Sequence, residues 1–240
     1  MVDIRPFIAF PPEAIAQTEE KVPSLLIYSF NILSKCLISS LLTEASVNLG
    51  HAEPVGIVAA QIFSLDAFIY KGIPMSDILW AKYRVICPSL WGLYGDEKTE
   101  SGRQAVGWWH TEPNGQGPYI TDQEHADRMT ALGAGFSALT LRNFGRAKRK
   151  NPFPNWIFWH SLYKLSSIPS NEMQDTQILL LGAMLRSSAE RVVQFFGQFG
   201  LAALHRVIID LPKELPRRTT AVNQLMLLKD LYLREKNIVI

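Results

Sequence analysis

Apolar residues recur at steps of three or four along most of this chain, and that spacing limits the fold more than any other feature. In the stretch from Glu13 to Val47 the recurring residues are Leu26, Phe30, Leu33, Leu37, Leu41 and Leu42. Residues at this spacing share one face of an α-helix. No segment shows the strict alternation of apolar and polar residues that is typical of a half-buried strand. The sequence therefore predicts an all-α fold.

Prolines and glycines divide the helical pattern into segments. We expect helices over residues 13–47, 55–70, 75–87, 121–141, 156–167, 173–186, 189–209 and 219–234. The connections between the last four are short and carry prolines, which favours antiparallel helix pairs. We predict one domain over residues 1–240, built from stacked antiparallel helical hairpins as a HEAT-like solenoid, although no residues repeat at a fixed period.

Two segments depart from the helical pattern. Residues 1–12 contain three prolines and are expected to form an extended lead-in. Residues from about 92 to 119 are rich in glycine and acidic residues and have no helical period, so we interpret them as an inserted surface loop. Within it, Trp108 and Trp109 are expected to hold the loop down by packing rather than to stack on a ligand.

Composition limits the class of protein. Hydrophobic residues make up 48% of the chain, which suits a large core, and a net charge of only +2 argues against a general nucleic-acid-binding protein. Cys36 and Cys87 lie in apolar helical patterns without metal-ligand spacing, which predicts buried thiols in a reducing compartment. We find no signal peptide and no uninterrupted apolar run near the roughly 20 residues of a membrane span. We expect a soluble intracellular protein, or a domain cut from a longer one.

One helix start is specified in detail. Thr121 or Asp122 is a favourable N-cap, and Glu124 stands near the position that completes a capping box. Gly133 and Gly135 lie farther along the same helix, where each costs about 1 kcal/mol relative to alanine. Small residues at such positions indicate the close approach of a neighbouring helix.

The most uneven charge distribution lies between Leu141 and Trp156. Five cations fall within nine residues there: Arg142, Arg146, Lys148, Arg149 and Lys150. Cations near a helix C-terminus are favoured by the helix dipole, and blocks of like charge are often simply solvated. Crowded cations also repel one another unless an anion binds them, so a site for a phosphate-rich ligand is the alternative interpretation.

Residues for catalysis or metal binding do not form a recognisable pattern. The five histidines are scattered, without a carboxylate at metal-binding spacing, and the glycines do not form a phosphate-binding loop. No nucleophile elbow or cysteine–histidine pair stands out. We assign the acidic group Asp122, Glu124 and Asp127 to the positive end of its helix dipole. The sequence favours a binding scaffold with no enzymatic activity and no metal site.

Aromatic residues occupy more than one face of the helix expected at 156–167. Trp156, Trp159 and Tyr163 follow helical spacing and are expected to pack inward. Phe158 and its neighbours on the C-terminal helices are then candidates to line a groove that binds a partner protein. The alternative is that all of these rings belong to the core.

Four segments resemble a known family. The runs LSKCLI, AKYRVICPSLWG, FSALTLRNFGRAKRKNPFP and NWIFWHSLYKLSSIP look like the C-terminal domain of the fungal GLFG-lethal family of mRNA export factors. The resemblance covers most of residues 20–240 in order. Its most specific points are the cysteine–proline helix end and the basic run followed by prolines. The segment at 92–119 exceeds the family pattern.

The resemblance implies a specific function. Members of that family act at the cytoplasmic face of the nuclear pore, between nucleus and cytoplasm, where they stimulate a DEAD-box RNA-dependent ATPase. In fungi, inositol hexakisphosphate lies between the two proteins as a tether. A short terminal segment of an FG nucleoporin is a further partner. The family domain is similar in shape to the HEAT-like middle domain of the eukaryotic translation-initiation scaffold.

The resemblance also implies a ligand site with two walls. One wall is expected from Arg146, Lys148, Arg149 and Lys150, with Arg142 as an addition, and the opposite wall from Lys35 and Lys82. For either of the last two, a solvated surface charge is the alternative. The competing function is a helical scaffold or RNA-binding module whose basic cluster contacts the nucleic-acid backbone. We favour it less, and expect no direct RNA binding, because the cations gather at one helix end and are not interleaved with aromatic residues.

Overall fold

The computed structural model describes residues 2–3, 21–22, 24–70, 73–112, 115, 117–145, 148–149 and 151–240. Its helices are α1 (Ser24–Ser40), α2 (Ala52–Phe63), α3 (Asp77–Ile86), α4 (Glu100–Val106), α5 (Asp122–Thr140), α6 (Asn155–Ser166), α7 (Asp175–Arg186), α8 (Ala189–His205), α9 (Leu211–Glu214) and α10 (Thr220–Lys236). The strands are two-residue antiparallel pairs, β1 (Val2–Asp3) with β2 (Lys21–Val22) and β3 (Ile69–Tyr70) with β4 (Ile73–Pro74). The prediction of an all-α fold is confirmed.

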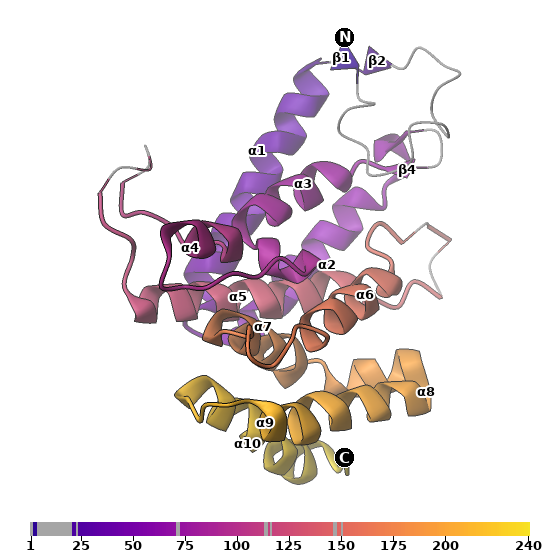
Figure 1. The fold of residues 1–240 in the computed structure, drawn as a ribbon. Helices are drawn as coiled ribbons and strands as arrows, with labels where there is room; N and C mark the ends of the chain where they lie inside the picture. The colour runs from indigo at the N-terminus through magenta and orange to yellow at the C-terminus, as the bar shows by residue number, and fades with distance from the viewer. Residues whose placement is uncertain are drawn as a thin grey trace.

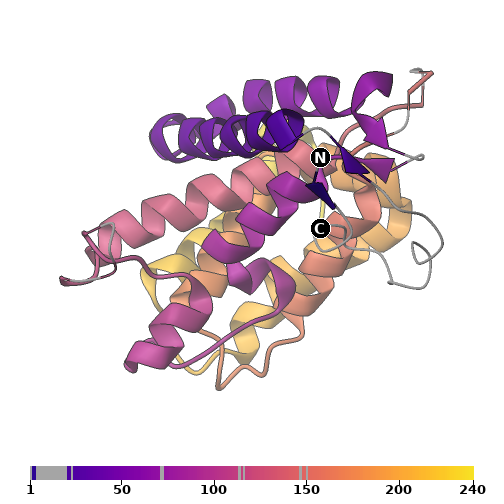
Figure 2. The same cartoon turned by 90° about the horizontal axis from the view of Figure 1, so that it is seen from above.

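Helix α5 is the centre of the molecule. Every residue from Ala131 to Thr140 is buried, so this half of the helix is covered on all sides. It packs against α2 on one side and α7 on the other, and α7 packs in turn against α10. The helices therefore stack in successive layers, with α1 and α3 at one end and α8 to α10 at the other (Figure 1). Seen from above, the C-terminal helices lie behind α5 (Figure 2). This layering matches the solenoid-like stack that was predicted.

The start and the glycines of α5 agree with the sequence. The Thr121 side chain accepts from the Glu124 amide, and the Glu124 carboxylate accepts from the Thr121 amide at 2.8 Å, which completes the capping box. A Cβ on Gly133 would lie 2.9 Å from the Cβ of Ala183 in α7, and one on Gly135 would lie 2.6 Å from a Leu41 methyl. Both glycines therefore allow close helix packing, as expected.

A third glycine holds α2 against α5 and gives a stability test. A Cβ on Gly56 would lie 2.5 Å from the carbonyl oxygen of Ala138 in α5, whereas the nearest atom to a Cβ on Gly182 in α7 is 4.0 Å away. We expect Gly56→Ala to lower the free energy of unfolding by at least about 2 kcal/mol, because two helix backbones must separate. Gly182→Ala, the matched control, should raise it by up to about 1 kcal/mol.

Urea unfolding of both variants, followed by circular dichroism, measures this difference. Similar effects of the two substitutions would contradict the close contact between α2 and α5.

The N-terminal helices are shorter than the sequence suggested. Residues 21–22 are extended, so the helix expected from residue 13 begins at Ser24, and residues 13–20 lie outside the described part. The extended lead-in at 1–12 also lies outside it, apart from β1. Helix α2 ends at Phe63 rather than at 70, because the chain turns through a 3-10 segment, Asp66–Phe68, into β3.

The insertion at 92–119 contains a helix that the sequence did not predict. The Thr99 side chain caps α4 by accepting from the Gly102 amide at 3.0 Å. At Gly102 a side chain would collide with the backbone of Asp96, so the glycine that hid the helical pattern is needed for packing. The interpretation as an irregular surface loop was wrong for these residues.

The expected packing role of the tryptophan pair is confirmed for Trp108. Its buried ring stacks on His125 of α5 at 4.0 Å between centroids, and its Nε1 donates to the Glu97 carboxylate at 3.2 Å. Trp109 is half exposed and lies under the guanidinium of Arg128 at 3.6 Å. The insertion is thus attached to α5 by two aromatic contacts.

His125 makes the stability of this attachment depend on pH. Burial, followed by the charges of Arg128 and Arg103, lowers the His125 pKa to about 3. The unfolded chain binds a proton on this residue below about pH 6.5 and the folded chain does not, so stability is lost as the pH falls through that range. We expect a loss of about 2 kcal/mol from this group between pH 7 and pH 5.

His125→Gln should remove this part of the pH dependence. The neighbouring Glu97 has a pKa raised by burial, which acts in the opposite direction, but it is common to both proteins and cancels in the comparison. The measurement is urea unfolding at pH 7, 6 and 5. If the wild type and the His125→Gln variant lost the same amount of stability as the pH falls, His125 would have to be protonated in the folded protein.

The C-terminal half has one large departure from expectation. The helix predicted over 189–209 is broken at Gly197, whose φ of +56° and ψ of −131° are accessible only to glycine. A Cβ on Gly200 would lie 2.6 Å from the Val192 carbonyl oxygen, so the chain folds back on itself within α8. It continues through a π-helical turn, Arg206–Asp210, into α9.

Two predictions from composition need correction. Cys87 is buried as expected, but Cys36 is exposed on α1. By length and composition alone, the segments Ser24–Ala45 and Ala189–Glu214 could cross a membrane. This differs from the expectation that no segment is long and apolar enough to do so. Core helices of soluble proteins pass the same test, so it is weak evidence for a membrane span.

Candidate functional site

A groove of about 930 Å³ runs between α1 and α3. Its lining is mainly apolar, from residues such as Ile27, Leu42, Ile78 and Val85. Lys35 of α1 and Lys82 of α3 are among the lining residues, so each helix contributes one cation. The structure therefore brings together the two lysines that were predicted to form one wall.

The electrostatics of the groove confirm that the two lysines are close. Burial lowers the pKa of Lys82, and the positive charge of Lys35 lowers it further. Lys35 itself is exposed and Lys82 is half buried. A pair of cations beside an apolar surface is a favourable site for an anion, because the anion relieves their repulsion.

The spacing of the lining residues could have identified this groove from the sequence. Ile27, Asn31 and Lys35 follow one another at steps of four on α1, and Ile78 and Lys82 do so on α3. This is the spacing of one helix face. Trp109 also lines the groove, and no feature of the sequence indicates this because the residue comes from the insertion.

The loop from Leu141 to Pro154 carries the basic cluster. Lys148 and Arg149 are exposed and are not among the residues that line the groove, while Arg146 and Lys150 lie outside the described residues. The far end of the loop is fixed to α3: Ser76 Oγ donates to the Pro152 carbonyl at 2.9 Å. The end of the loop at Pro152 is therefore tied to the beginning of one of the two groove helices.

The buried ring of Phe153 anchors the same end of the loop. It packs edge-on against Trp80 at 5.4 Å and Phe63 at 5.7 Å between centroids. Two helices of the N-terminal half, α3 and α2, thus hold this end of the loop.

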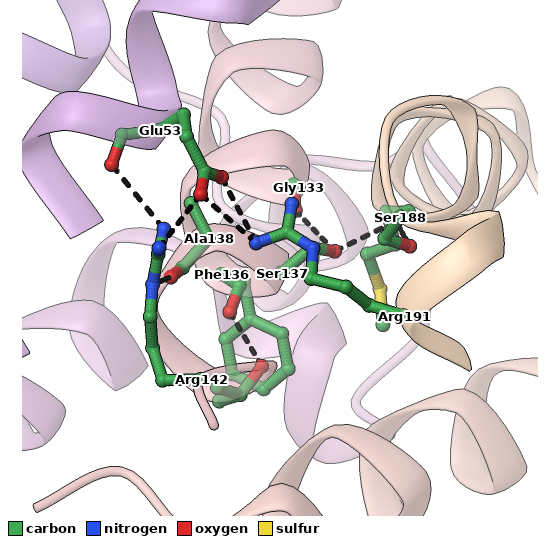
Figure 3. Close-up of polar contacts among 10 residues, drawn as sticks. Glu53, Gly133, Phe136, Ser137, Ala138, Arg142, Ser188 and Arg191 are labelled. Atoms are coloured by element: carbon green, nitrogen blue, oxygen red, sulfur yellow. Dashed lines mark hydrogen bonds and ion pairs between the residues drawn. The ribbon is translucent and has the colours of Figure 1, made fainter. Parts of the chain in front are cut away.

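Arg142 has a different role from the one that was expected. Its guanidinium forms an ion pair with Glu53 of α2 at 2.6 Å, and its Nε donates to the Ala138 carbonyl at 2.6 Å (Figure 3). Arg191 of α8 pairs with the other oxygen of Glu53 at 2.9 Å. Burial lowers the pKa of Arg142, while hydrogen bonding to Glu53 acts in the opposite direction. This arginine joins α2, α5 and α8 and shares the Glu53 carboxylate with Arg191, so its guanidinium is already engaged within the fold.

The prediction for the aromatic residues of α6 was wrong in its direction. Phe158 is fully buried, whereas Trp156 and Tyr163 are each 65% exposed. Trp159 is partly buried and packs against Phe196 at 4.7 Å between centroids. Phe158 therefore cannot line a partner groove and belongs to the core, as the alternative interpretation had it, whereas Trp156 and Tyr163, two of the three rings expected in the core, face solvent.

Chemistry for catalysis is not visible in the described part of the chain. No group of three or more histidine, cysteine, aspartate or glutamate side chains could hold a metal ion there. The buried His125 contacts the Thr176 hydroxyl at 2.8 Å and its ring stacks on Trp108, which are packing contacts. The described site is a groove and a charged loop, which can bind an anion.

Known proteins resemble this chain over most of its length. A family model described as GLE1-like protein matches residues 11–208. The mRNA export factor GLE1 of Chaetomium thermophilum is 39% identical over 225 residues, covering 94% of this chain and 42% of the relative. The Saccharomyces cerevisiae protein of the same name is 24% identical over 171 residues, covering 70% and 30%. The chain spans less than half the length of the curated relatives it matches.

Solved structures of S. cerevisiae Gle1 share the fold. In one, Gle1 is bound with IP6 to the C-terminal domain of a Dbp5 variant; it matches with a TM-score of 0.74 and 20% identity and covers 87% of this chain and 69% of that one. A second, with a Gle1 variant in the same complex, gives a TM-score of 0.73 at the same identity and coverage. The matched family model confirms the resemblance seen in the four sequence segments, and the chain belongs to the GLE1-like protein family.

Proposed function

We propose that this chain is a non-enzymatic mRNA export factor that binds and stimulates a DEAD-box RNA-dependent ATPase at the cytoplasmic face of the nuclear pore. Inositol hexakisphosphate acts as the tether between the two proteins. Membership of the GLE1-like family supports this proposal, as does the shared fold with a Gle1 that was solved with Dbp5 and IP6. The curated relatives are named as export factors, which supports a chain without ATPase activity of its own.

The observation that carries the ligand site is the convergence of Lys35 and Lys82 on one groove. Two ammonium groups from separate helices lie close enough for one to lower the pKa of the other. A hexakisphosphate offers several phosphate groups on one ring, so it can bind both lysines at once and leave others free. Lys148 and Arg149, with Arg146 and Lys150 beyond the described residues, form the other wall in this proposal, and Arg142 is left out of it.

Calorimetric titration with inositol hexakisphosphate tests the site. We expect Lys35→Gln with Lys82→Gln to weaken binding by about 150-fold, since each of the two lost charge-assisted contacts contributes roughly 1.5 kcal/mol. The matched control is Lys98→Gln with Lys229→Gln, which removes the same charge from exposed positions elsewhere. Equal losses in the two double variants would show that only net charge matters and would remove the groove from the site.

A terminal segment of an FG nucleoporin is a second proposed partner, expected on residues 155–240. Exposed apolar side chains on α8 and α10, among them Phe199 and Leu227, support this region. A hydrogen-exchange map in which the peptide protects only residues outside 155–240 would contradict this placement.

A further inference from the structure

We propose that the outer face of α6, together with the exposed cations Lys148 and Arg149 of the loop before it, binds single-stranded nucleic acid. Trp156 and Tyr163 are seven residues apart, which places their Cα atoms on one helix face about 10 Å apart. His160 lies between them and is also exposed. The α6 face is separate from the groove between α1 and α3, and the two proposals share only the loop cations Lys148 and Arg149.

The inner face of α6 explains why these rings lie outside. Phe158, Leu162 and Leu165 fill the contact with the core, and Trp159 fills the contact with Phe196 of α8. Trp156 and Tyr163 are therefore not surplus core residues. Each exposes most of a large ring to water, and exposed aromatic residues on one face indicate a contact surface for another molecule.

The charge around this face favours an anionic partner. No aspartate or glutamate occurs in the sequence between Asp127 and Glu172, a stretch that contains all of α6 and the basic loop. Exposed Lys148 and Arg149 lie in the loop that leads into α6. The 3-10 turn Pro88–Trp91 that packs beside α6 has no charged side chain, and its Trp91 carbonyl accepts from Lys164 Nζ at 3.1 Å. The ammonium group of Lys164 is thereby held beside the same helix.

Single-stranded nucleic acid matches both features at once. Its bases stack on aromatic rings, and its phosphates bind lysine and arginine. The sequence argued against nucleic acid because the cations gather at one helix end and are not interleaved with aromatic residues, and Trp156 and Tyr163 were expected to pack inward. Both rings are exposed, and the exposed cations Lys148 and Arg149 precede them in the same stretch without acidic residues, so stacking surfaces and phosphate-binding charges occur together.

Fluorescence anisotropy with a labelled decauridylate tests the proposal. We expect Trp156→Ala with Tyr163→Ala to weaken binding at least tenfold, because each base–ring stack that is lost reduces affinity several-fold or more. Tyr28→Ala, an equally exposed ring on α1, is the matched control and should bind as the wild type does. Circular dichroism checks that both variants are folded.

The salt dependence of binding, a second double variant and a DNA strand complete the test. Lys148→Gln with Arg149→Gln should make the slope of log affinity against log salt shallower by about 1.4, or roughly 0.7 per phosphate contact. The Lys35→Gln, Lys82→Gln double variant should keep its affinity for decauridylate, which separates this surface from the two lysines of the groove. Binding of decathymidylate as tight as that of RNA would support recognition through bases and phosphates.

Three results would overturn the proposal. These are no binding at low salt, equal binding by wild type and the Trp156→Ala, Tyr163→Ala variant, or tighter binding to a duplex than to the single strand. Protection of α6 by a phenylalanine-rich peptide, without any binding of nucleic acid, would identify the face as a protein-binding surface instead.

Discussion

Phe158→Ala is expected to lower the free energy of unfolding by about 3–5 kcal/mol, and Trp156→Ala by less than about 0.5 kcal/mol. The two residues are separated by one position on the same helix. Phe158 is fully buried and its ring lies 6.4 Å from that of Phe196, so its removal leaves a cavity between α6 and α8. Trp156 is mostly exposed, so its removal leaves no cavity.

Urea unfolding followed by circular dichroism measures both losses without relying on tryptophan fluorescence. Trp159→Ala, which removes a partly buried ring, should fall between the two. A larger loss from Trp156→Ala than from Phe158→Ala would restore the orientation of α6 that the sequence suggested, and would remove the basis of the proposed nucleic-acid surface.

The error at α6 shows what helical spacing can determine. Trp156, Trp159 and Tyr163 fit one face of the helix, but Phe158, Leu162 and Leu165 fit another equally well. Spacing identifies residues that share a face and does not say which face meets the core. The choice depends on the neighbouring helices, here on the Phe196 ring and on the packing against α5 and α7.

Local chemistry was a better guide at helix ends. The capping box at Thr121 and the stop of α3 before Pro88 were both predicted, because each depends on residues adjacent in sequence. The break in α8 was missed because a single glycine within an apolar run is also compatible with a continuous helix. The position of this break becomes clear only in the folded chain, where Gly200 lies against Val192.

Part of the candidate site was predictable from the spacing of residues along the helices. Lys35 and Lys82 belong to amphipathic helices, and the packing of α1 on α3 brings them together. The role of Arg142 could not be predicted, because its partner Glu53, which also pairs with Arg191, is far away in sequence. A charge block in a sequence therefore does not show which of its members are free to bind a ligand.

The second large effect concerns stimulation of the ATPase. We expect the chain alone to hydrolyse no ATP and to raise the turnover of its DEAD-box partner, with inositol hexakisphosphate strengthening the complex. A basic groove repels a similarly basic partner until a polyanion between them screens both surfaces. In the Lys35→Gln, Lys82→Gln variant, the factor by which the ligand raises the affinity for the partner should fall at least about tenfold. A change of this size lies within the usual range of coupling between sites.

Linkage makes the tether mechanism testable from both sides. The partner must raise the affinity of the chain for the ligand by the same factor by which the ligand raises the affinity for the partner. Lys148→Gln with Arg149→Gln should lower both factors equally, and should change the free energy of unfolding by less than about 0.5 kcal/mol because both side chains are exposed. Calorimetry of each pair, with and without the third component, gives the two factors.

Full stimulation by the ligand in that variant would show that the ligand does not act through the loop. Lys148 and Arg149 would then be solvated charges beyond the end of α5, and the anion site would be reduced to the groove with its two lysines. A second result would rule out the tether altogether: a variant that no longer binds the ligand but whose partner affinity, measured with the ligand present, equals that of the wild type. A ligand that binds the free chain and the complex equally well cannot strengthen the complex.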